Sequence, residues 1–230
     1  MIDRNLNYGR HVLKLFIKNK IFSNVLDIGA GSGDDLKIIR DANLSAKLFA
    51  LEGYAPNVKK LKKLGFSPEL INLEKDMFPY RNNSFDLIIA NQILEHCKEL
   101  FWIFHEISRT LKVGGYFFLG VPNLASLHNR LLLLFGLQPT CIHSFGPHVR
   151  GFTTNDMINF IQKIFPGGYE VIYIKGSNFY PFPPFIANFL SKLFPSLAVA
   201  IFIGVRKTKV YNSEFLKYPI NLETNFWIGK

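Results

Sequence analysis

Residues 25–33 have the sequence VLDIGAGSG, an apolar run that ends in three alternating glycines, Gly29, Gly31 and Gly33. The run predicts a buried strand over Val25–Gly29, and the apolar spacing of Asp34–Ala42 predicts a helix. Glycines between a strand and a helix allow positive φ angles and a close approach of the backbone to a ligand. We therefore predict a ligand-binding turn at the carboxyl end of a strand.

The spacing of these glycines disfavours two phosphate-binding loops. A dinucleotide fingerprint would place its third glycine at position 34, which is Asp34, and an acid at a helix N-terminus repels phosphate. The Gly-Lys-Ser/Thr of a P-loop is missing from the sequence too. We expect a nucleoside-like ligand with a cationic group near Asp27.

Strands and helices alternate through the first half of the chain. Further strands are predicted over Lys47–Glu52, Glu69–Leu73, Phe85–Ala90 and Tyr116–Val121, and helices over Tyr8–Lys20, Pro56–Leu64 and Cys97–Leu111. This alternation predicts a doubly wound α/β fold, a parallel sheet covered on both faces. Glu52 ends the second strand, where an acid can accept hydrogen bonds from both ribose hydroxyls of a nucleoside.

The second half has a different organisation. Helices are predicted over Ser126–Phe135, 153–165 and 186–194, and strands over Tyr169–Lys175 and Ala198–Arg206. We expect one domain over residues 1–210, with lid insertions at about 122–155 and 176–197 and a tail over 211–230.

Composition narrows the class of protein. The 230 residues are 48% hydrophobic, which excludes disorder, and the net charge of +10 favours anionic partners unless it reflects a lysine-rich composition alone. The two cysteines, Cys97 and Cys141, exclude a disulfide framework and a cysteine-based zinc site. Because the longest clean apolar run, Leu197–Val205, is too short to span a bilayer and the first residues form no signal-peptide pattern, we expect a cytoplasmic protein.

An ordered set of segments resembles the motifs of the class I S-adenosylmethionine-dependent methyltransferases. The matching segments are Val25–Gly33, the acid Glu52, Phe78–Tyr80 with Asn83–Ala90, Leu94–His96 and Leu111–Tyr116. The resemblance covers residues about 20 to 122 and implies a Rossmann-like, seven-stranded sheet with a reversed last strand. The two strands predicted in the second half would complete such a sheet.

The resemblance also implies S-adenosylmethionine as the cofactor and assigns its contacts. Asp27 and the glycine turn would hold the methionine part, and Glu52 would hold the ribose. Asn72 and Leu73 follow the third strand, where the family places an acid for the adenine amino group. The full predicted set is Asp27, Gly29, Ala30, Gly31, Gly33, Glu52, Gly53, Asn72, Leu73, Asn91 and Gln92.

The resemblance further implies O-methylation of a small-molecule, sugar or lipid-linked acceptor. Segments 121–126, 129–130 and 148–153 are similar to a subgroup associated with sugar or surface-polysaccharide pathways. Asn91-Gln92-Ile93-Leu94 lacks the prolines of adenine N-methyltransferases. A hydroxyl acceptor benefits from a base with a near-neutral pKa, for which His148 is the first candidate and His143 the second, while Arg150 could pair with a substrate carboxylate or phosphate.

Several alternatives stay open. In related ubiquinone-type O-methyltransferases, acids near a Glu-His pair like Glu95-His96 hold a metal, but Gln92 stands where another acid would be, so we expect no metal. The chain could instead be a catalytically inactive cofactor-binding partner subunit, or an RNA methyltransferase, although nucleic acid is not the expected partner. The apolar segments 127–137 and 179–205 predict a lid over a lipid-linked substrate or peripheral membrane contact, unless they pack internally or in a dimer, so the chain is a monomer or a homodimer.

Overall fold

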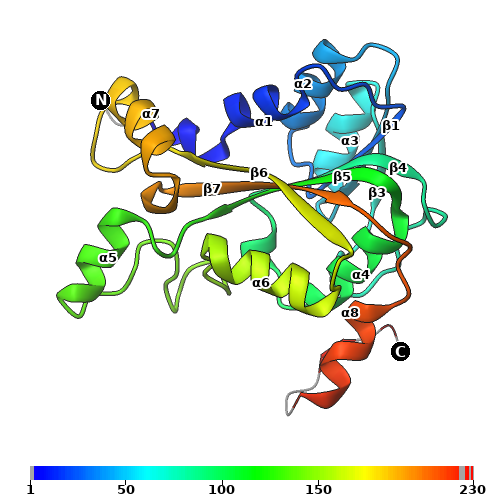
Figure 1. The fold of residues 1–230 in the computed structure, drawn as a ribbon. Helices are drawn as coiled ribbons and strands as arrows, with labels where there is room; N and C mark the ends of the chain where they lie inside the picture. The colour runs from blue at the N-terminus through cyan, green and yellow to red at the C-terminus, as the bar shows by residue number, and fades with distance from the viewer. Residues whose placement is uncertain (1–2, 223–225, 228, 230) are drawn as a thin grey trace.

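A computed structural model describes residues 3–222, 226–227 and 229. Its centre is a seven-stranded sheet in the order β3-β2-β1-β4-β5-β7-β6 (Figure 1). β7 pairs antiparallel with β5 and β6, whereas the other pairs are parallel. This order confirms the doubly wound sheet with a reversed last strand. The strands are β1 (Asn24–Ile28), β2 (Lys47–Glu52), β3 (Ser67–Leu70), β4 (Phe85–Asn91), β5 (Leu111–Pro122), β6 (Tyr169–Ser177) and β7 (Ala200–Lys207).

Helices cover both faces of this sheet. α1 (Arg10–Ile17), α2 (Asp34–Ala42) and α3 (Ala55–Lys63) lie on one face, and α4 (Leu100–Thr110), α6 (Thr154–Ile164) and α8 (Glu214–Lys217) lie on the other (Figure 1). Each long helix buries one apolar stripe, such as Phe16 on α1 and Phe104 on α4, against strand side chains. Burial of such stripes is the main stabilising contribution of these helices.

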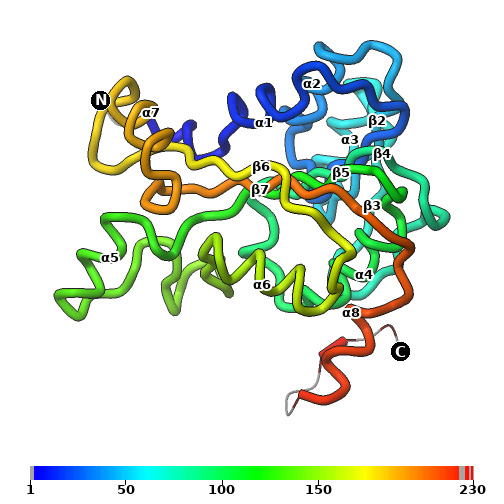
Figure 2. The backbone as a smooth tube through the Cα atoms, in the orientation of Figure 1, coloured from blue at the N-terminus to red at the C-terminus, as the bar shows by residue number. Residues whose placement is uncertain are grey.

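Two further helices lie together at one end of the molecule. α5 (Leu127–Leu134) follows the carboxyl end of β5, and α7 (Pro184–Leu193) connects β6 to β7 (Figure 2). Because β5 ends at Pro122 opposite the start of β7 at Ala200, both helices extend from the edge where the parallel strands end. Both fall within the segments predicted to form a lid. No helix in the described ranges is both long enough and apolar enough to cross a bilayer.

Three segments differ from the sequence prediction. β3 is Ser67–Leu70 rather than Glu69–Leu73, because this edge strand is mostly exposed and has little apolar pattern. β5 already begins at Leu111, the last residue of the predicted helix and five residues before the predicted strand, and Gly114, with φ +84°, lies in a bulge of β5. The region after residue 210, for which little periodicity was found, forms α8, whose fully buried Phe215 lies 5.4 Å from the Phe104 ring.

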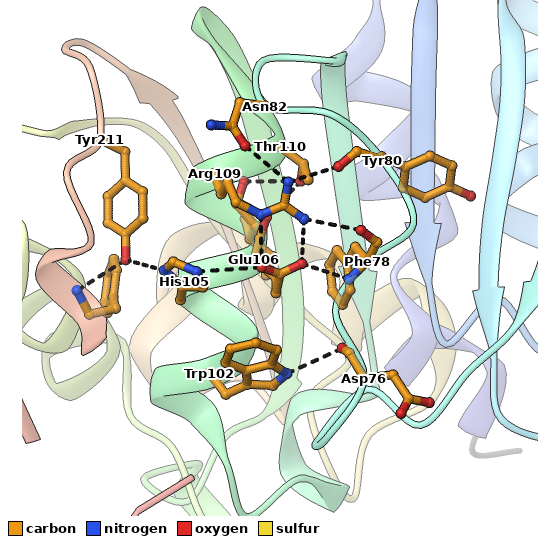
Figure 3. A network of polar contacts seen from close by, with 12 residues as sticks. Asp76, Phe78, Tyr80, Asn82, Trp102, His105, Glu106, Arg109, Thr110 and Tyr211 are labelled. Carbon is orange, nitrogen blue, oxygen red and sulfur yellow. Dashed lines mark hydrogen bonds and ion pairs between the residues drawn. The ribbon is translucent and has the colours of Figure 1, made fainter. Parts of the chain in front are cut away.

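A buried ion pair ties α4 to the segment that precedes β4 (Figure 3). Glu106, which has no exposed surface, pairs with Arg109 and accepts a 2.6 Å hydrogen bond from the Phe78 backbone N–H. Arg109 donates to the carbonyls of Phe78 at 3.1 Å and Tyr80 at 2.7 Å. This network fixes the chain between β3 and β4.

Candidate functional site

The glycine turn after β1 has the backbone conformation that its sequence predicts. Gly29, Gly31 and Gly33 have φ angles of +69°, +51° and +75°, which side chains rarely allow. A Cβ on Gly29 would lie 2.6 Å from Ile93, and one on Gly33 would lie 2.7 Å from Leu61. A Cβ on Gly31 would meet only a carbonyl oxygen at 4.0 Å, so this glycine leaves open space beside the turn.

Glu52 at the end of β2 lies directly against this turn. Its carboxylate accepts hydrogen bonds from the Gly31 N–H at 2.8 Å and the Tyr54 N–H at 2.9 Å. The Gly29 N–H in turn donates to the Leu51 carbonyl at 2.8 Å. β1 and β2 are parallel neighbours, so their carboxyl ends bring together two features that lie about 20 residues apart in the sequence.

Two cavities flank the glycine turn, and Gly29 lines both. The first has a volume of about 650 Å³ and is bounded by Glu52, the residues after β3, and the segment after β4. The second, of about 340 Å³, is bounded by Asp27, the turn and the end of β4. Of the predicted cofactor residues, Glu52, Gly53, Asn72 and Leu73 line the first, Asp27, Ala30, Gly31, Asn91 and Gln92 line the second, and Gly33 lines neither.

Asp27 is a buried acid in the smaller cavity. Its side chain is 2% exposed, and burial raises its pKa well above the ordinary carboxyl value. The negative charges of Asp35 and Glu52 raise this pKa further, and Arg10 opposes them. A cationic group bound beside Asp27 would stabilise its ionised form, as expected for a ligand that carries an ammonium group.

Two residues that line this smaller cavity were missed by the sequence analysis. Arg10, on α1, forms ion pairs with Asp34 at 3.1 Å and Asp35 at 3.4 Å. The carbonyl of Tyr8 accepts from the Asn91 side-chain amide at 2.8 Å. Nothing local in the sequence marks either residue, because both reach the site only after the N-terminal segment packs across the end of the sheet.

The turn after β3 uses its polar groups internally. The Asn72 Oδ1 atom accepts from the Glu74 N–H at 3.0 Å, and the Asn72 N–H donates to Asp76 at 2.7 Å. Glu74 accepts from the backbone N–H groups of Lys98 and Glu99. Recognition of an adenine amino group by Asn72 therefore stays a prediction, although Asn72 and Leu73 do line the cavity.

A third cavity, of about 400 Å³, lies beside the first two and is lined partly by the segment 122–155 that was predicted to form a lid. It shares Tyr8 and Gln92 with the smaller cavity and His96 with the larger one. Its remaining lining includes Glu95, His128, Asn129, Thr140, Cys141 and His148. A ligand in this cavity would meet the smaller cavity at Gln92.

The three predicted catalytic residues do not come together. His148 lines the third cavity, whereas His143 lies outside its lining and stacks on Phe145 with ring centroids 5.5 Å apart. Arg150 also lies outside that lining and donates to the Lys98 carbonyl at 2.6 Å. Of the three, only His148 lines the third cavity.

Glu95 and His96 accompany His148 in the wall of the third cavity. They lie in a 3₁₀ turn, Leu94–His96, that follows β4. Burial raises the pKa of Glu95 to about 7. The pKa of His96 is lowered, first by burial and further by the neighbouring His148.

An apolar groove of about 1070 Å³ continues from the third cavity. The two share Arg4, Asn7, His128, Thr140 and Val199. The groove is lined by Leu127, Leu131, Leu132 and Phe135 from α5 and its C-terminal end, and by Tyr180, Pro181 and Phe182 before α7. The site thus runs from a polar cavity beside the glycine turn to an apolar surface at the end of the molecule.

Residues 26–119 match the family described as a methyltransferase domain. The chain is 32% identical over 117 residues to an uncharacterised protein of Methanocaldococcus jannaschii, covering 50% of this chain and 42% of that protein. It is 27% identical over 94 residues to the malonyl-[acyl-carrier protein] O-methyltransferase of Legionella pneumophila, covering 40% of this chain and 33% of that enzyme. The chain thus matches less than half the length of either relative.

The fold is shared with solved methyltransferase structures. An S-adenosylmethionine-dependent methyltransferase of Archaeoglobus fulgidus superimposes with a TM-score of 0.59 at 14% identity, covering 86% of this chain and 94% of that one. Since 86% of the chain is covered, this similarity in fold extends beyond residues 26–119. Residues 26–119 are therefore similar to a methyltransferase domain, and the chain has the fold of solved S-adenosylmethionine-dependent methyltransferases.

Proposed function

We propose that this chain transfers the methyl group of S-adenosylmethionine to a hydroxyl of an acceptor that has a polar head and an apolar chain. The observation that carries the proposal is the continuity of the cavities. The third cavity shares Tyr8 and Gln92 with the cavity at the glycine turn, and shares His128 and Thr140 with the apolar groove. An acceptor that fills both would present a polar group at Gln92.

The residues present fit the cofactor. Gly31 leaves space for a ligand against the backbone, and Glu52 presents a carboxylate beside it. The buried Oδ1 atom of Asn91 has no hydrogen-bond partner among the described residues, although its amide group donates to Tyr8 and Asp35. In the proposed complex Glu52 binds the ribose, Asp27 lies near the ammonium group, and Asn91 with Gln92 borders the methyl group.

The cofactor, when bound, supplies an activated methyl group on a sulfonium, so the protein has mainly to position the acceptor. The acceptor oxygen forms a bond to the methyl carbon while the bond from that carbon to sulfur breaks. S-adenosylhomocysteine leaves, and the hydroxyl loses its proton. Glu95, His96 and His148 are ionisable groups in the lining of the third cavity and could accept that proton.

Two observations support oxygen as the methylated atom and an amphipathic acceptor. The Legionella relative is by name an O-methyltransferase. The third cavity is lined by imidazole, amide and hydroxyl groups, which suit a hydroxylated head such as a sugar, whereas the groove beyond it is lined mainly by leucine and aromatic residues. A lipid-linked sugar would satisfy both surfaces.

Calorimetric titration with S-adenosylhomocysteine tests the cofactor assignment. We expect the wild-type chain to bind with micromolar affinity, and Glu52→Gln to bind at least about tenfold more weakly because a ribose contact is lost. Glu69→Gln, on the exposed face of β3, is the matched control and should bind like wild type. Wild-type protein that does not bind S-adenosylhomocysteine would overturn the proposal.

Methyl transfer to alcohols from labelled S-adenosylmethionine then tests the reaction itself. Label found in an ether product with at least one amphipathic alcohol would support the proposal. Tight cofactor binding without transfer to any alcohol, sugar or lipid-linked sugar would contradict it, and would favour a cofactor-binding subunit that serves a partner enzyme.

A further inference from the structure

Three potential metal ligands converge in the wall of the third cavity. Glu95 and His96 follow β4, and His148 comes from the lid about 50 residues later in the chain. The Val149 N–H donates a hydrogen bond to the Glu95 carbonyl at 2.8 Å, which holds the loop around His148 against the 3₁₀ turn Leu94–His96. One ligand atom from each of the three side chains lies within 4.8 Å of the others.

Backbone carbonyls fix the protonation of both imidazoles. The Nδ1 atom of His96 lies 3.2 Å from the Pro147 carbonyl oxygen, and that of His148 lies 2.7 Å from the Cys141 carbonyl oxygen. A carbonyl oxygen can only accept, so each Nδ1 carries the proton and each Nε2 keeps a lone pair. Histidines that bind metals show this arrangement, in which one nitrogen binds the ion and the other donates to an oxygen.

The third side chain is a buried acid that lacks a partner. Glu95 is 1% exposed, and its Oε2 atom has no hydrogen-bond partner among the described residues. The Oε1 atom lies 4.0 Å from the Nε2 atom of His96. A buried carboxylate without a partner is costly, and a cation placed between the carboxylate and the two lone pairs would satisfy all three groups.

We propose that Glu95, His96 and His148 bind a divalent transition metal ion whose remaining positions face the third cavity. Two imidazoles and one carboxylate favour ions such as Zn²⁺, Co²⁺ or Mn²⁺ over Mg²⁺ and Ca²⁺, which prefer oxygen ligands. Tetrahedral ligands at about 2.1 Å from an ion lie about 3.4 Å apart, so the ligand atoms must approach one another by roughly 1 Å.

His148 supplies a ligand that the local sequence around residue 95 lacks. Gln92 stands where another acid would complete a local set, so the sequence alone disfavours a metal. The structure completes the set from the lid instead, and His148 becomes a ligand rather than a general base. Because the cation and its ligands close the lid loop onto β4, metal binding should also order this wall of the cavity.

A role for the ion in activating an acceptor hydroxyl rests on the proposed methyl transfer, whereas the metal site itself does not. An ion held by these residues would lower the pKa of a coordinated acceptor hydroxyl, whose proton would pass to solvent. The acceptor oxygen would bond to the methyl carbon as the bond from that carbon to sulfur breaks and S-adenosylhomocysteine leaves. An acceptor oxygen held there would be next to Gln92, which borders both the third cavity and the cofactor cavity.

Metal titration of the full chain, stripped with a chelator, tests the proposal. The probes are Zn²⁺ in calorimetry and Co²⁺ in visible absorption, where bound Co²⁺ reports its ligands. We expect one equivalent of Zn²⁺ to bind, with affinity at least about tenfold lower in Glu95→Gln and in His148→Ala. His128→Ala is the matched control, since His128 lines the same cavity outside the cluster, and should bind like wild type.

Binding that is weak in wild type, or that is unchanged in Glu95→Gln, would overturn the proposal. Glu95→Gln preserves the shape of the side chain, so it decides the question even where His148→Ala fails to fold. S-adenosylhomocysteine binding is measured on the same stripped samples. If they bind S-adenosylhomocysteine but not Zn²⁺, the metal proposal fails and the methyltransferase proposal stands. If they bind Zn²⁺ but not S-adenosylhomocysteine, the metal proposal stands and the methyltransferase proposal fails.

Discussion

At the glycine turn, three residues of one type have different structural roles. Gly29 and Gly33 combine a positive φ with close packing, against Ile93 and Leu61 respectively, whereas Gly31 faces open space. A residue other than glycine would therefore harm the fold at the first two positions and the ligand space at the third. The two physical causes can be separated, because a side chain at Gly29 or Gly33 would meet both backbone strain and steric overlap, whereas one at Gly31 would meet backbone strain alone.

Gly29→Ala should lower the free energy of unfolding by about 3 kcal/mol, of which about 1 kcal/mol is the cost of its positive φ and the rest is overlap with Ile93. Gly65→Ala is the control, because Gly65 has φ +81° but no atom within 4 Å of the position that a Cβ would take, and should cost only about 1 kcal/mol. Urea unfolding followed by circular dichroism measures both. Equal losses of unfolding free energy in the two variants would show that steric overlap with Ile93 does not contribute to the cost at residue 29.

Asp27 should make ligand binding at the proposed cofactor site depend on pH. Its raised pKa means that the folded, unliganded chain keeps this proton above pH 3.8, where the unfolded chain has lost it. Between those two pKa values the folded state binds more protons than the unfolded state, so rising pH lowers the stability contributed by this group. A bound ammonium group would favour the ionised form of Asp27, so binding of such a ligand would release a proton.

The affinity for S-adenosylhomocysteine should consequently increase with pH until Asp27 is ionised in the free protein, by up to about tenfold per pH unit in the steepest range. Calorimetry from about pH 5 to about pH 8 measures this slope. We expect Asp27→Asn to bind weakly and to lose most of the slope, while Asp41→Asn, an exposed control on α2, keeps it. A slope that survives in Asp27→Asn would assign the proton to another group.

Among the secondary-structure elements, α4 organises the segment before β4 through the Glu106–Arg109 pair (Figure 3). Trp102 adds a hydrogen bond from its indole N–H to the Asp76 carbonyl at 3.3 Å. His105 extends the network to Tyr211, 2.9 Å away, and so to the C-terminal region. One helix thereby fixes both the segment that continues from the cofactor cavity and the start of the C-terminal tail.

Arg109→Met should destabilise the chain by about 3 kcal/mol, because it leaves Glu106 buried with an unpaired charge. Thermal and urea unfolding measure the loss, and Arg81→Met, at an exposed position, is the control. The double variant Glu106→Gln, Arg109→Met should recover part of the stability, since both charges are gone. A single variant as stable as wild type would mean that Glu106 is not held by this pair.

Across the molecule as a whole, α5 and α7 lie at one end (Figures 1 and 2), where an apolar groove shares lining residues with the polar third cavity. α5 and its C-terminal end leave Leu131, Leu134 and Phe135 at least half exposed, and α7 exposes Phe185 and Phe189. Apolar surface of this kind gathered at one end marks a binding surface more often than scattered residues do. In the proposed function, this surface is the feature that favours an amphipathic acceptor over a small polar one.

In a series of primary alcohols, kcat/KM should rise by up to about fourfold per added methylene, because each buried CH₂ contributes about 0.8 kcal/mol. Phe135→Ser should flatten this dependence for long alcohols and leave the shortest alcohol unchanged. Phe145→Ser, an exposed residue outside the groove, is the matched control. A chain-length dependence identical in Phe135→Ser and wild type would place the apolar chain elsewhere.

Local sequence patterns were enough to predict the order of strands and helices, the doubly wound sheet and the meeting of the glycine turn with Glu52. Continuous apolar strands that alternate with amphipathic helices allow few arrangements, and the carboxyl ends of neighbouring parallel strands must lie side by side. Asp27, Gly31 and Glu52 could therefore be placed at one site from short-range patterns. β3 was misplaced by two or three residues because an exposed edge strand carries little apolar periodicity.

Packing between distant segments determines which further residues complete the site, and this could be learned from the folded structure alone. Arg10 reaches Asp34 and Asp35 from the N-terminal helix, and His148 reaches Glu95 and His96 from the lid. The separation of His148 from His143 and Arg150, all predicted from one loop, depends on the backbone hydrogen bonds of that loop to the turn after β4. Such contacts join elements far apart in the chain, and no local spacing of residue types encodes them.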